Sequence, residues 1–435
     1  MRFSTLFSKA TQIAPNEVKA AVTSFVFIFL LMASYMIAKP VRDSLSSEFT
    51  DPELARLWTL TFLASIVAVF IYNLFAARLT LKRLVPGVFV VFALSFILTA
   101  LALKTGYDRV LLGKFFYVWI SVFSLFHISV FWSFMSQLYS KGQSKRIFAF
   151  INLGASAGAI LGSLAVNQYL YQFPLEVKLV VTSATLLVVI PLIRVLDQDM
   201  NPKPDAKASE FSKLNANPFS GIKEFITHKR LIGIASFIFI FVGIGTFFYL
   251  AQKEILSVYS KPEREQILSV LNIIVNVLTF LLGLFATNRI AAKFGLATAL
   301  AVIPVIMAGA LILFSTVPTV AVFLILETIR KSGNYAITRP SREILFTSVD
   351  QEARFKTKPF IDVAVYRGGD VFWGWFFVAL GVDGIFGLDL PQKLVVGAVI
   401  ALVWAALGFY LGRKHEQEEI EADAIKSNEL DRVSQ

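Results

Sequence analysis

Long apolar runs recur along the whole chain and restrict its fold more than any other feature. A membrane-spanning helix needs about 20 consecutive apolar residues, and roughly twelve runs of this kind alternate with short polar segments. Hydrophobic residues make up 56% of the 435 residues and charged residues only 16%. This composition is typical of a multi-pass membrane protein and not of a soluble domain. We therefore predict an all-α membrane protein, with twelve transmembrane helices at approximately residues 20–38, 57–77, 85–103, 115–138, 150–165, 179–195, 231–250, 268–286, 296–316, 318–346, 359–381 and 394–411.

The basic residues indicate the orientation of the chain. The formal net charge is +11. Lys and Arg gather in alternate short loops such as RLTLKR and SKGQSKR, whereas the opposite loops mix acids with bases. This is the positive-inside pattern of membrane proteins and not a nucleic-acid-binding surface. We expect a multi-pass protein of the bacterial cytoplasmic (inner) membrane, with both termini in the cytoplasm and no nucleic-acid partner.

The two halves of the chain resemble each other. LFAARLTLK follows the second predicted helix and LFATNRIAAK follows the eighth, while FINLGASAG enters the fifth and FIDVAVYRGG enters the eleventh. Ordered matches at nearly one shift indicate an internal duplication. Two six-helix bundles in parallel repeat are the major facilitator architecture. We predict an N-terminal six-helix bundle at 1–195, a cytoplasmic linker at 196–229, a C-terminal six-helix bundle at 230–412 and a charged cytoplasmic tail, helical and solvated or disordered, at 413–435.

Charged residues in two adjacent spans are the main functional signal. Glu327, Arg330 and Lys331 lie near the middle of the tenth predicted helix, and Arg367 and Asp370 near the middle of the eleventh. An ionised side chain at the bilayer centre costs about 2.5–3.5 kcal/mol, so five such groups facing lipid would cost about 12–17 kcal/mol. They must therefore face a protein interior or a water-filled cavity.

Helical spacing groups these residues with polar neighbours. Residues three and four apart share a helical face, which places Asn334 with the first cluster and aligns Tyr366 with Asp370 and Asp362. The guanidinium fork binds phosphate and carboxylate groups bidentately. We predict that the substrate-binding residues are Arg330, Lys331, Arg367, Tyr366 and Asn334. We expect Glu327, Asp370 and Asp362 to serve in coupling or as charge partners.

A purely structural interpretation stays open at this point. Glu327 could pair with Arg330 or Lys331, and Arg367 with Asp370, as internal ion pairs. Three bases against two acids leave one positive charge without an acid, and pairing alone does not explain it. We therefore favour an anion-handling pathway. A lone histidine within the fourth helix, His127, is a weaker candidate, because such residues more often serve in packing.

Charged clusters near the ends of the spans suggest gates. We predict an outer gate formed by Lys39, Arg42, Asp43, Lys253 and Glu254, with anchoring at the membrane interface as the alternative. We predict an inner gate formed by Arg339, Arg342 and Glu343. Pro340 lacks a backbone donor and should kink the tenth helix beside the inner gate.

Three motifs resemble a known family. KPVRDSL after the first helix, RPSREILF at the end of the tenth and FKTKPFIDVAVYRGGD into the eleventh are similar to the ATP/ADP exchange translocases. These are nucleotide transporters of plastids and obligate intracellular bacteria, with untested relatives in free-living bacteria, and the compact loops resemble the latter branch. The resemblance implies a twelve-helix major facilitator fold and exchange or proton-driven uptake of nucleotides. It extends a functional role to the matching positions Lys39, Arg42, Asp43, Arg342, Glu343, Asp362 and Arg367.

These features favour a secondary active transporter of an anionic, phosphorylated solute, with a nucleotide as the first candidate. The alternatives are an exporter or flippase of a larger amphiphilic or lipid-linked anion, and a non-transporting membrane sensor or scaffold. We expect no enzyme activity, because no phosphate-binding loop of the GxxxxGK[ST] type and no HExxH motif occurs. The chain contains no cysteine, and we expect no metal or other cofactor. The expected partners are the lipid bilayer, the small anionic solute and either protons or a counter-substrate, with the protein as a monomer.

Overall fold

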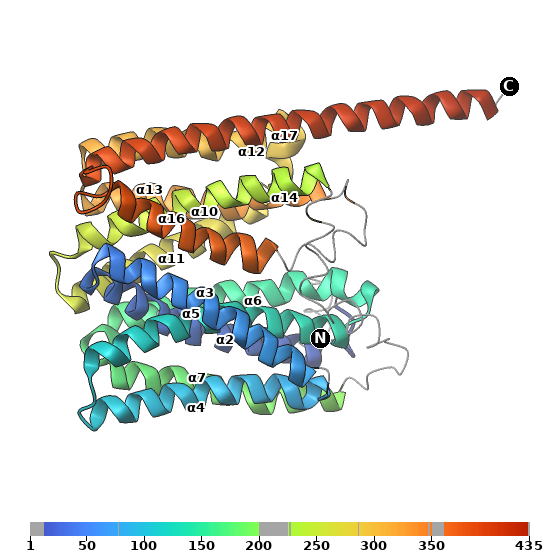
Figure 1. Ribbon diagram of the computed structural model, residues 1–435. Helices are drawn as coiled ribbons and strands as arrows, with labels where there is room; N and C mark the ends of the chain where they lie inside the picture. The colour runs from blue at the N-terminus through green and yellow to red at the C-terminus, as the bar shows by residue number, and fades with distance from the viewer. Residues whose placement is uncertain are drawn as a thin grey trace. The chain divides into compact units, whose positions relative to one another are not determined.

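The computed structural model describes residues 13–76, 78–199, 225, 228–285, 287–346, 349 and 361–433. Within these ranges the regular elements are helices (Figure 1). Ten of the described helices are long and apolar enough to cross a membrane. Of two further segments, Val320–Leu345 contains a π-helical turn and Ile361–Leu380 begins with one. With these two, the described part of the chain contains twelve spans, which confirms the predicted all-α fold class.

The chain divides into two compact units. Unit 1 comprises residues 1–216 and 256–277, and unit 2 comprises residues 217–255 and 278–435. Helix α11 (Lys261–Phe285) is therefore shared between them. The predicted domain boundaries at 195, 229 and 412 stay a prediction, and most of the predicted linker lies outside the described residues.

Six long helices form most of unit 1: α2 (Val18–Leu45), α3 (Asp51–Ala76), α4 (Leu81–Lys104), α5 (Arg109–Leu138), α6 (Lys141–Gln168) and α7 (Leu175–Asp199). Short polar caps begin two of them. The Asp108 side chain accepts hydrogen bonds from the first turn of α5, and Ser140 forms a capping box with Gln143 at the start of α6. Both arrangements satisfy backbone donors that an isolated helix end leaves free.

A row of small residues brings α6 into close contact with α2. A Cβ atom at Gly154, Gly158 or Gly162 would lie 2.7, 2.1 or 2.6 Å from the carbonyl oxygen of a residue in α2. Only glycine permits such an approach of two backbones, as in other membrane helix pairs. The Gly-rich helix α6 therefore packs tightly against α2.

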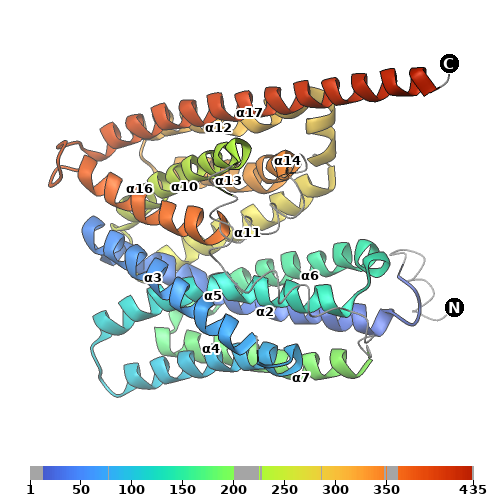
Figure 2. The same ribbon diagram turned by 45° about the vertical axis from the view of Figure 1, so that its right-hand side comes forward.

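Aromatic and aliphatic side chains, with a few hydroxyls, pack within unit 1. Phe27 packs edge-on against Phe89 and Phe131, with ring centroids 5.8 and 4.9 Å apart. Ser183 of α7 donates a hydrogen bond to the Ala93 carbonyl of α4 at 3.0 Å. In Figures 1 and 2, α4 and α7 accordingly lie side by side.

Unit 2 is built from α10 (Lys229–Leu256), α12 (Thr287–Thr316), α13 (Val320–Gly333), the π-helical η3 (Asn334–Thr338), α14 (Arg339–Leu345), the π-helical η5 (Ile361–Val365), α16 (Tyr366–Leu380) and α17 (Leu390–Val433). Helices α12 and α17 lie side by side in both views (Figures 1 and 2). A Cβ atom at Gly408 of α17 would lie 2.9 Å from the Leu300 carbonyl oxygen of α12. The last turns of α17 extend well beyond the end of α12.

Candidate functional site

A three-residue charge cluster lies in α13, within unit 2. Glu327 accepts two hydrogen bonds from Arg330, at 2.6 Å from Nε and 2.8 Å from Nη2. The Lys331 ammonium lies 2.9 Å from Oε1 of the same carboxylate, the oxygen that also accepts from Arg330 Nη2. Glu327 and Arg330 are buried, with 3% and 9% exposure, whereas the Lys331 side chain is 24% exposed. One acid thus holds two bases, and the cluster carries a net positive charge.

The Arg330 guanidinium packs against helix α10. A Cβ atom at Gly245 would lie only 3.3 Å from Arg330 Nη1. The Arg330 Cζ atom also lies 5.7 Å from the centre of the Phe248 ring, within range of a cation–π interaction. The absence of a side chain at residue 245 therefore allows the guanidinium to pack against α10.

Two π-helical turns lie in the spans that carry the predicted site: η3 stands between α13 and α14, and η5 directly precedes α16. Pro340 is the second residue of α14, and a proline ring clashes with the carbonyl four residues earlier. That carbonyl belongs to Ala336, in the middle of η3. The kink expected at Pro340 thus takes the form of a π-helical turn, which interrupts the regular hydrogen bonding of the α-helix. Such turns occur frequently at functional sites.

Arg342 links these two interrupted spans. Its Nη1 donates a hydrogen bond of 2.7 Å to the Tyr366 hydroxyl, and its Nη2 lies 3.6 Å from Glu343 Oε1. Arg342 is 7% exposed, and its Nε is buried with no hydrogen-bond partner among the described residues. A buried guanidinium N–H of this kind has the capacity to bind one more acceptor oxygen.

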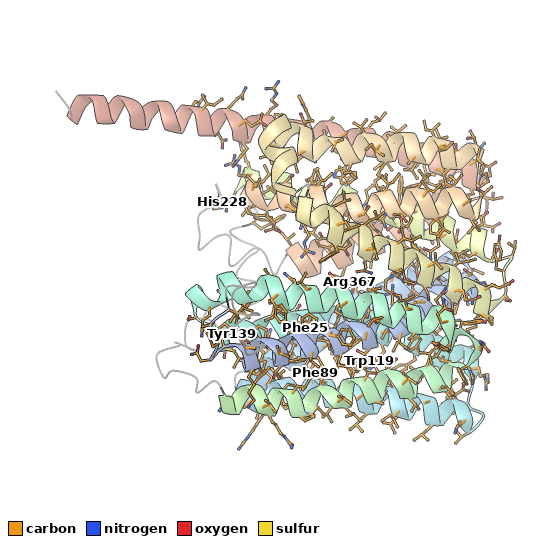
Figure 3. The ribbon with its side chains drawn as sticks, turned by 180° about the vertical axis from the view of Figure 1, so that it is seen from behind. Phe25, Phe89, Trp119, Tyr139, His228 and Arg367 are labelled. Atoms are coloured by element: carbon orange, nitrogen blue, oxygen red, sulfur yellow. The ribbon has the colours of Figure 1, made fainter. Side chains whose placement is uncertain are left out.

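Arg367 and Asp370 lie in the first turns of α16 (Arg367 is labelled in Figure 3). Arg367 Nη1 is 3.5 Å from Asp370 Oδ2, a long contact for an ion pair. The two side chains are 20% and 36% exposed, so this pair is more accessible than the Glu327 cluster. Asp362 belongs to η5, but its side chain lies outside the described residues.

The structure therefore places every predicted substrate-binding residue in unit 2, but not at one point. Arg330 and Lys331 share Glu327, whereas Tyr366 bonds Arg342 and Arg367 contacts Asp370. Asn334 begins η3. Both ion pairs of the structural interpretation are present, and three bases still stand against two acids. The roles assigned to these residues stay predictions.

The predicted outer-gate residues fall into two units. In unit 1, Lys39 and Arg42 both contact the Asp43 carboxylate, at 3.2 and 2.6 Å. Lys253 and Glu254 end α10 and are assigned to unit 2. The outer gate assigned to these groups stays a prediction. Of the inner-gate residues, Arg342 and Glu343 lie together and Arg339 is exposed.

His127 is placed as a packing residue would be. Its Nδ1 lies 3.2 Å from the Phe123 carbonyl oxygen, and its ring centre is 4.5 Å from that of Tyr35. Within the described residues no cluster of three or more His, Asp or Glu residues could hold a metal ion.

One buried ion pair has no counterpart in the sequence-based predictions. Lys178 of α7 contacts Glu265 of α11, and their side chains are 5% and 0% exposed. The available signal was a polar stripe in an apolar helix. Glu265, Ser269, Asn272 and Asn276 are four, three and four residues apart, which places them on one face of α11.

The fold agrees with the sequence comparisons. The family model described as Major Facilitator Superfamily matches residues 21–341, well over half of the chain. The chain belongs to the major facilitator superfamily. The comparison with curated proteins gives no match.

Solved structures of transporters share the fold. A bacterial homologue of the human lysosomal transporter Spinster, inward-facing and unoccupied, is 14% identical over 93% of this chain and 98% of its own, with a TM-score of 0.62. A mutant of the nucleoside transporter NupG is 14% identical over 91% of this chain and 99% of its own, with a TM-score of 0.65. A POT family transporter in complex with a thioalcohol-conjugated peptide is 10% identical over 91% of this chain and 96% of its own, with a TM-score of 0.64. At such identities the likeness concerns the fold alone.

Proposed function

We propose that this protein is a secondary active transporter that moves an anionic, phosphorylated solute across the inner membrane by alternating access. A nucleotide is the first candidate substrate. Membership of the major facilitator superfamily supports a transporter of small solutes, and the similar folds include a nucleoside and a peptide transporter. The motif resemblance to the ATP/ADP exchange translocases supports the choice of a nucleotide.

The main observation in favour of an anionic substrate is the charge balance of α13. Glu327 can balance only one of the two cations that it contacts, Arg330 and Lys331. An excess charge inside a span is unfavourable unless a counter-ion or water reaches it. Lys331 is the more exposed of the two cations, and an anionic oxygen can reach its ammonium without displacing Arg330.

The arginines add groups suited to a phosphate. Arg367 is 20% exposed beside Asp370, and Arg342 retains a buried N–H with capacity for a further acceptor. Guanidinium groups bind phosphate oxygens in a bidentate manner, and lysine adds a point charge. A solute with several anionic oxygens matches this set better than a neutral nucleoside or peptide does.

Coupling proceeds either by exchange for a counter-substrate or by protons. Of the two acids, Asp370 is the better candidate to take up a proton, because it is 36% exposed whereas Glu327 is held by two cations. Transport requires no ATP hydrolysis, since the sequence contains no phosphate-binding loop of the GxxxxGK[ST] type.

A thermal-shift screen of the purified protein tests the substrate class. A ligand that binds only the folded state raises the unfolding temperature in a concentration-dependent way. We expect nucleotides to raise it and the matching nucleosides not to do so at equal concentration. Stabilisation by lipid phosphates alone would instead favour an exporter or flippase, and stabilisation by none of these ligands would count against an anion carrier.

A further inference from the structure

The buried pair Lys178–Glu265 joins segments from the two repeats within unit 1. Lys178 lies in the first turn of α7, and Glu265 in the second turn of α11, the second long helix after the linker. Residues 256–277, including this part of α11, group with unit 1, whereas the rest of α11 groups with unit 2. Helix α11 therefore changes unit within its own length.

Further polar contacts fix the same segment of α11. The Asn167 side chain donates to the Gln266 carbonyl at 3.3 Å, and the Gln266 side chain donates back to the Asn167 carbonyl at 3.2 Å. Two turns further along α11, Lys39 donates a hydrogen bond of 2.8 Å to Asn272 Oδ1. Hydrogen bonds and one ion pair thus join α11 to α2, α6 and α7.

The ion pair is a poor device for static stability. Removing two charges from water is expensive, and apolar residues of similar volume often stabilise a protein as well or better. In this pair, Glu265 Oε1 is buried and has no hydrogen-bond partner among the described residues. A contact of this type is better suited to opening and closing, because water can solvate charged groups again once they separate, whereas separated apolar surfaces remain unfavourable in water.

We propose that Lys178 and Glu265 form a latch that holds the first turns of α11 against α7 and must open in every transport cycle. The latch rests on the proposed transport function, because alternating access moves one repeat against the other. It is made of residues outside both predicted gates. The latch and a static pair differ in one respect: only a latch fails when it cannot open.

Paired substitutions separate the two roles. Lys178→Met alone leaves a buried carboxylate without a cation and should lower both the unfolding temperature and transport. The apolar pair Lys178→Met with Glu265→Leu should recover the unfolding temperature, yet its uptake should stay at least tenfold below that of the wild type. The charge reversal Lys178→Glu with Glu265→Lys should recover part of the uptake. Uptake at the wild-type rate in a stable apolar pair would overturn the latch.

A matched pair elsewhere in unit 1 provides the control. Arg109 and Glu176 form an ion pair of 3.0 Å between α5 and α7, and Glu176 precedes Lys178 by two residues. Arg109→Met with Glu176→Leu should leave uptake within twofold of the wild type. If this control loses uptake as strongly as the apolar latch pair does, the effect is not specific to α11 and the latch is rejected.

Cross-linking supplies a test that does not depend on the stability of the apolar pair. The wild-type chain has no cysteine, so Lys178→Cys with Glu265→Cys introduces the only two thiols. Joining them with a short, reducible bifunctional reagent should lower uptake at least tenfold relative to the same protein before cross-linking, and reduction should restore that starting rate. Unchanged uptake after complete cross-linking would refute the latch. Absence of nucleotide uptake by the wild type would instead refute the proposed function.

Discussion

Glu327 is the residue on which the charge balance of unit 2 depends. Its carboxylate bonds Arg330 through both oxygens and contacts Lys331 through Oε1, and it is itself almost completely buried. Breaking a buried ion pair by removing one partner leaves an uncompensated charge in a medium of low polarity. Glu327 therefore acts first as the counter-charge that allows two cations to reside inside the span.

Glu327→Gln should consequently destabilise the protein strongly. We expect a loss of about 3–5 kcal/mol in the free energy of unfolding, the range for breaking a buried pair. The double change Glu327→Gln with Arg330→Gln should recover part of that loss, because the buried Arg330 charge disappears together with its partner while Lys331 still lacks its acid. Chemical denaturation in detergent measures both values. A Glu327→Gln variant as stable as the wild type would show that water already screens this cluster.

At the scale of single elements, the close backbone contacts of α6 and the π-helical turns of unit 2 have different effects on the helices that contain them. The glycines of α6 bring its backbone against α2 and make that pair rigid. In contrast, η3 and η5 break the regular hydrogen bonding of the two spans that carry the candidate site. Stable packing in unit 1 and interrupted helices in unit 2 are consistent with a site that changes shape in unit 2.

Gly158→Ala tests the packing of α6 against α2. The added Cβ would lie 2.1 Å from the Phe29 carbonyl oxygen, and a backbone atom cannot move aside easily. We expect a loss of about 1–3 kcal/mol in stability, as for other overpacked positions. Gly87→Ala in α4 is the matched control, since nothing lies within 4 Å of its Cβ position. The thermal unfolding of the two variants should differ clearly, and equal unfolding temperatures would argue against the close contact.

Pro340→Ala tests whether the interruption of the tenth span is functional. Alanine restores a backbone donor and removes the clash with the Ala336 carbonyl, so η3 should revert towards α-helix. We expect equal or higher thermal stability, together with at least a threefold lower rate of transport, because the straightened span bends less readily. A variant that transports at the wild-type rate would mean that η3 has only a structural origin.

For the whole molecule, the apolar runs and the internal repeat were sufficient to predict the architecture. Span length and composition are direct consequences of bilayer thickness, so the twelve helices could be predicted before any coordinates were known. Pro340 and the glycines of α6 likewise have local effects that a sequence reveals. The predicted roles of Arg330 and Arg367 rest on the same reasoning about charge in a membrane, and they still await a functional test.

Other features could not be predicted because they depend on packing between distant segments. The Lys178–Glu265 pair joins residues 87 positions apart, and neither residue indicates its partner. The packing of Arg330 against Gly245 and the hydrogen bond between Arg342 and Tyr366 likewise join segments that are distant in the sequence. The polar stripe of α11 was visible in the sequence, but the helix against which it packs was not.

Uptake of radiolabelled nucleotide into proteoliposomes is the most direct test of the central claim, that the charged residues of unit 2 bind the anionic solute. Arg330→Gln and Arg367→Gln should each lower uptake at least tenfold while expression and membrane insertion stay near normal. Arg413→Gln, at an exposed arginine over the Phe409 ring, should leave uptake unchanged. Uptake at the wild-type rate in both site variants would contradict the assignment.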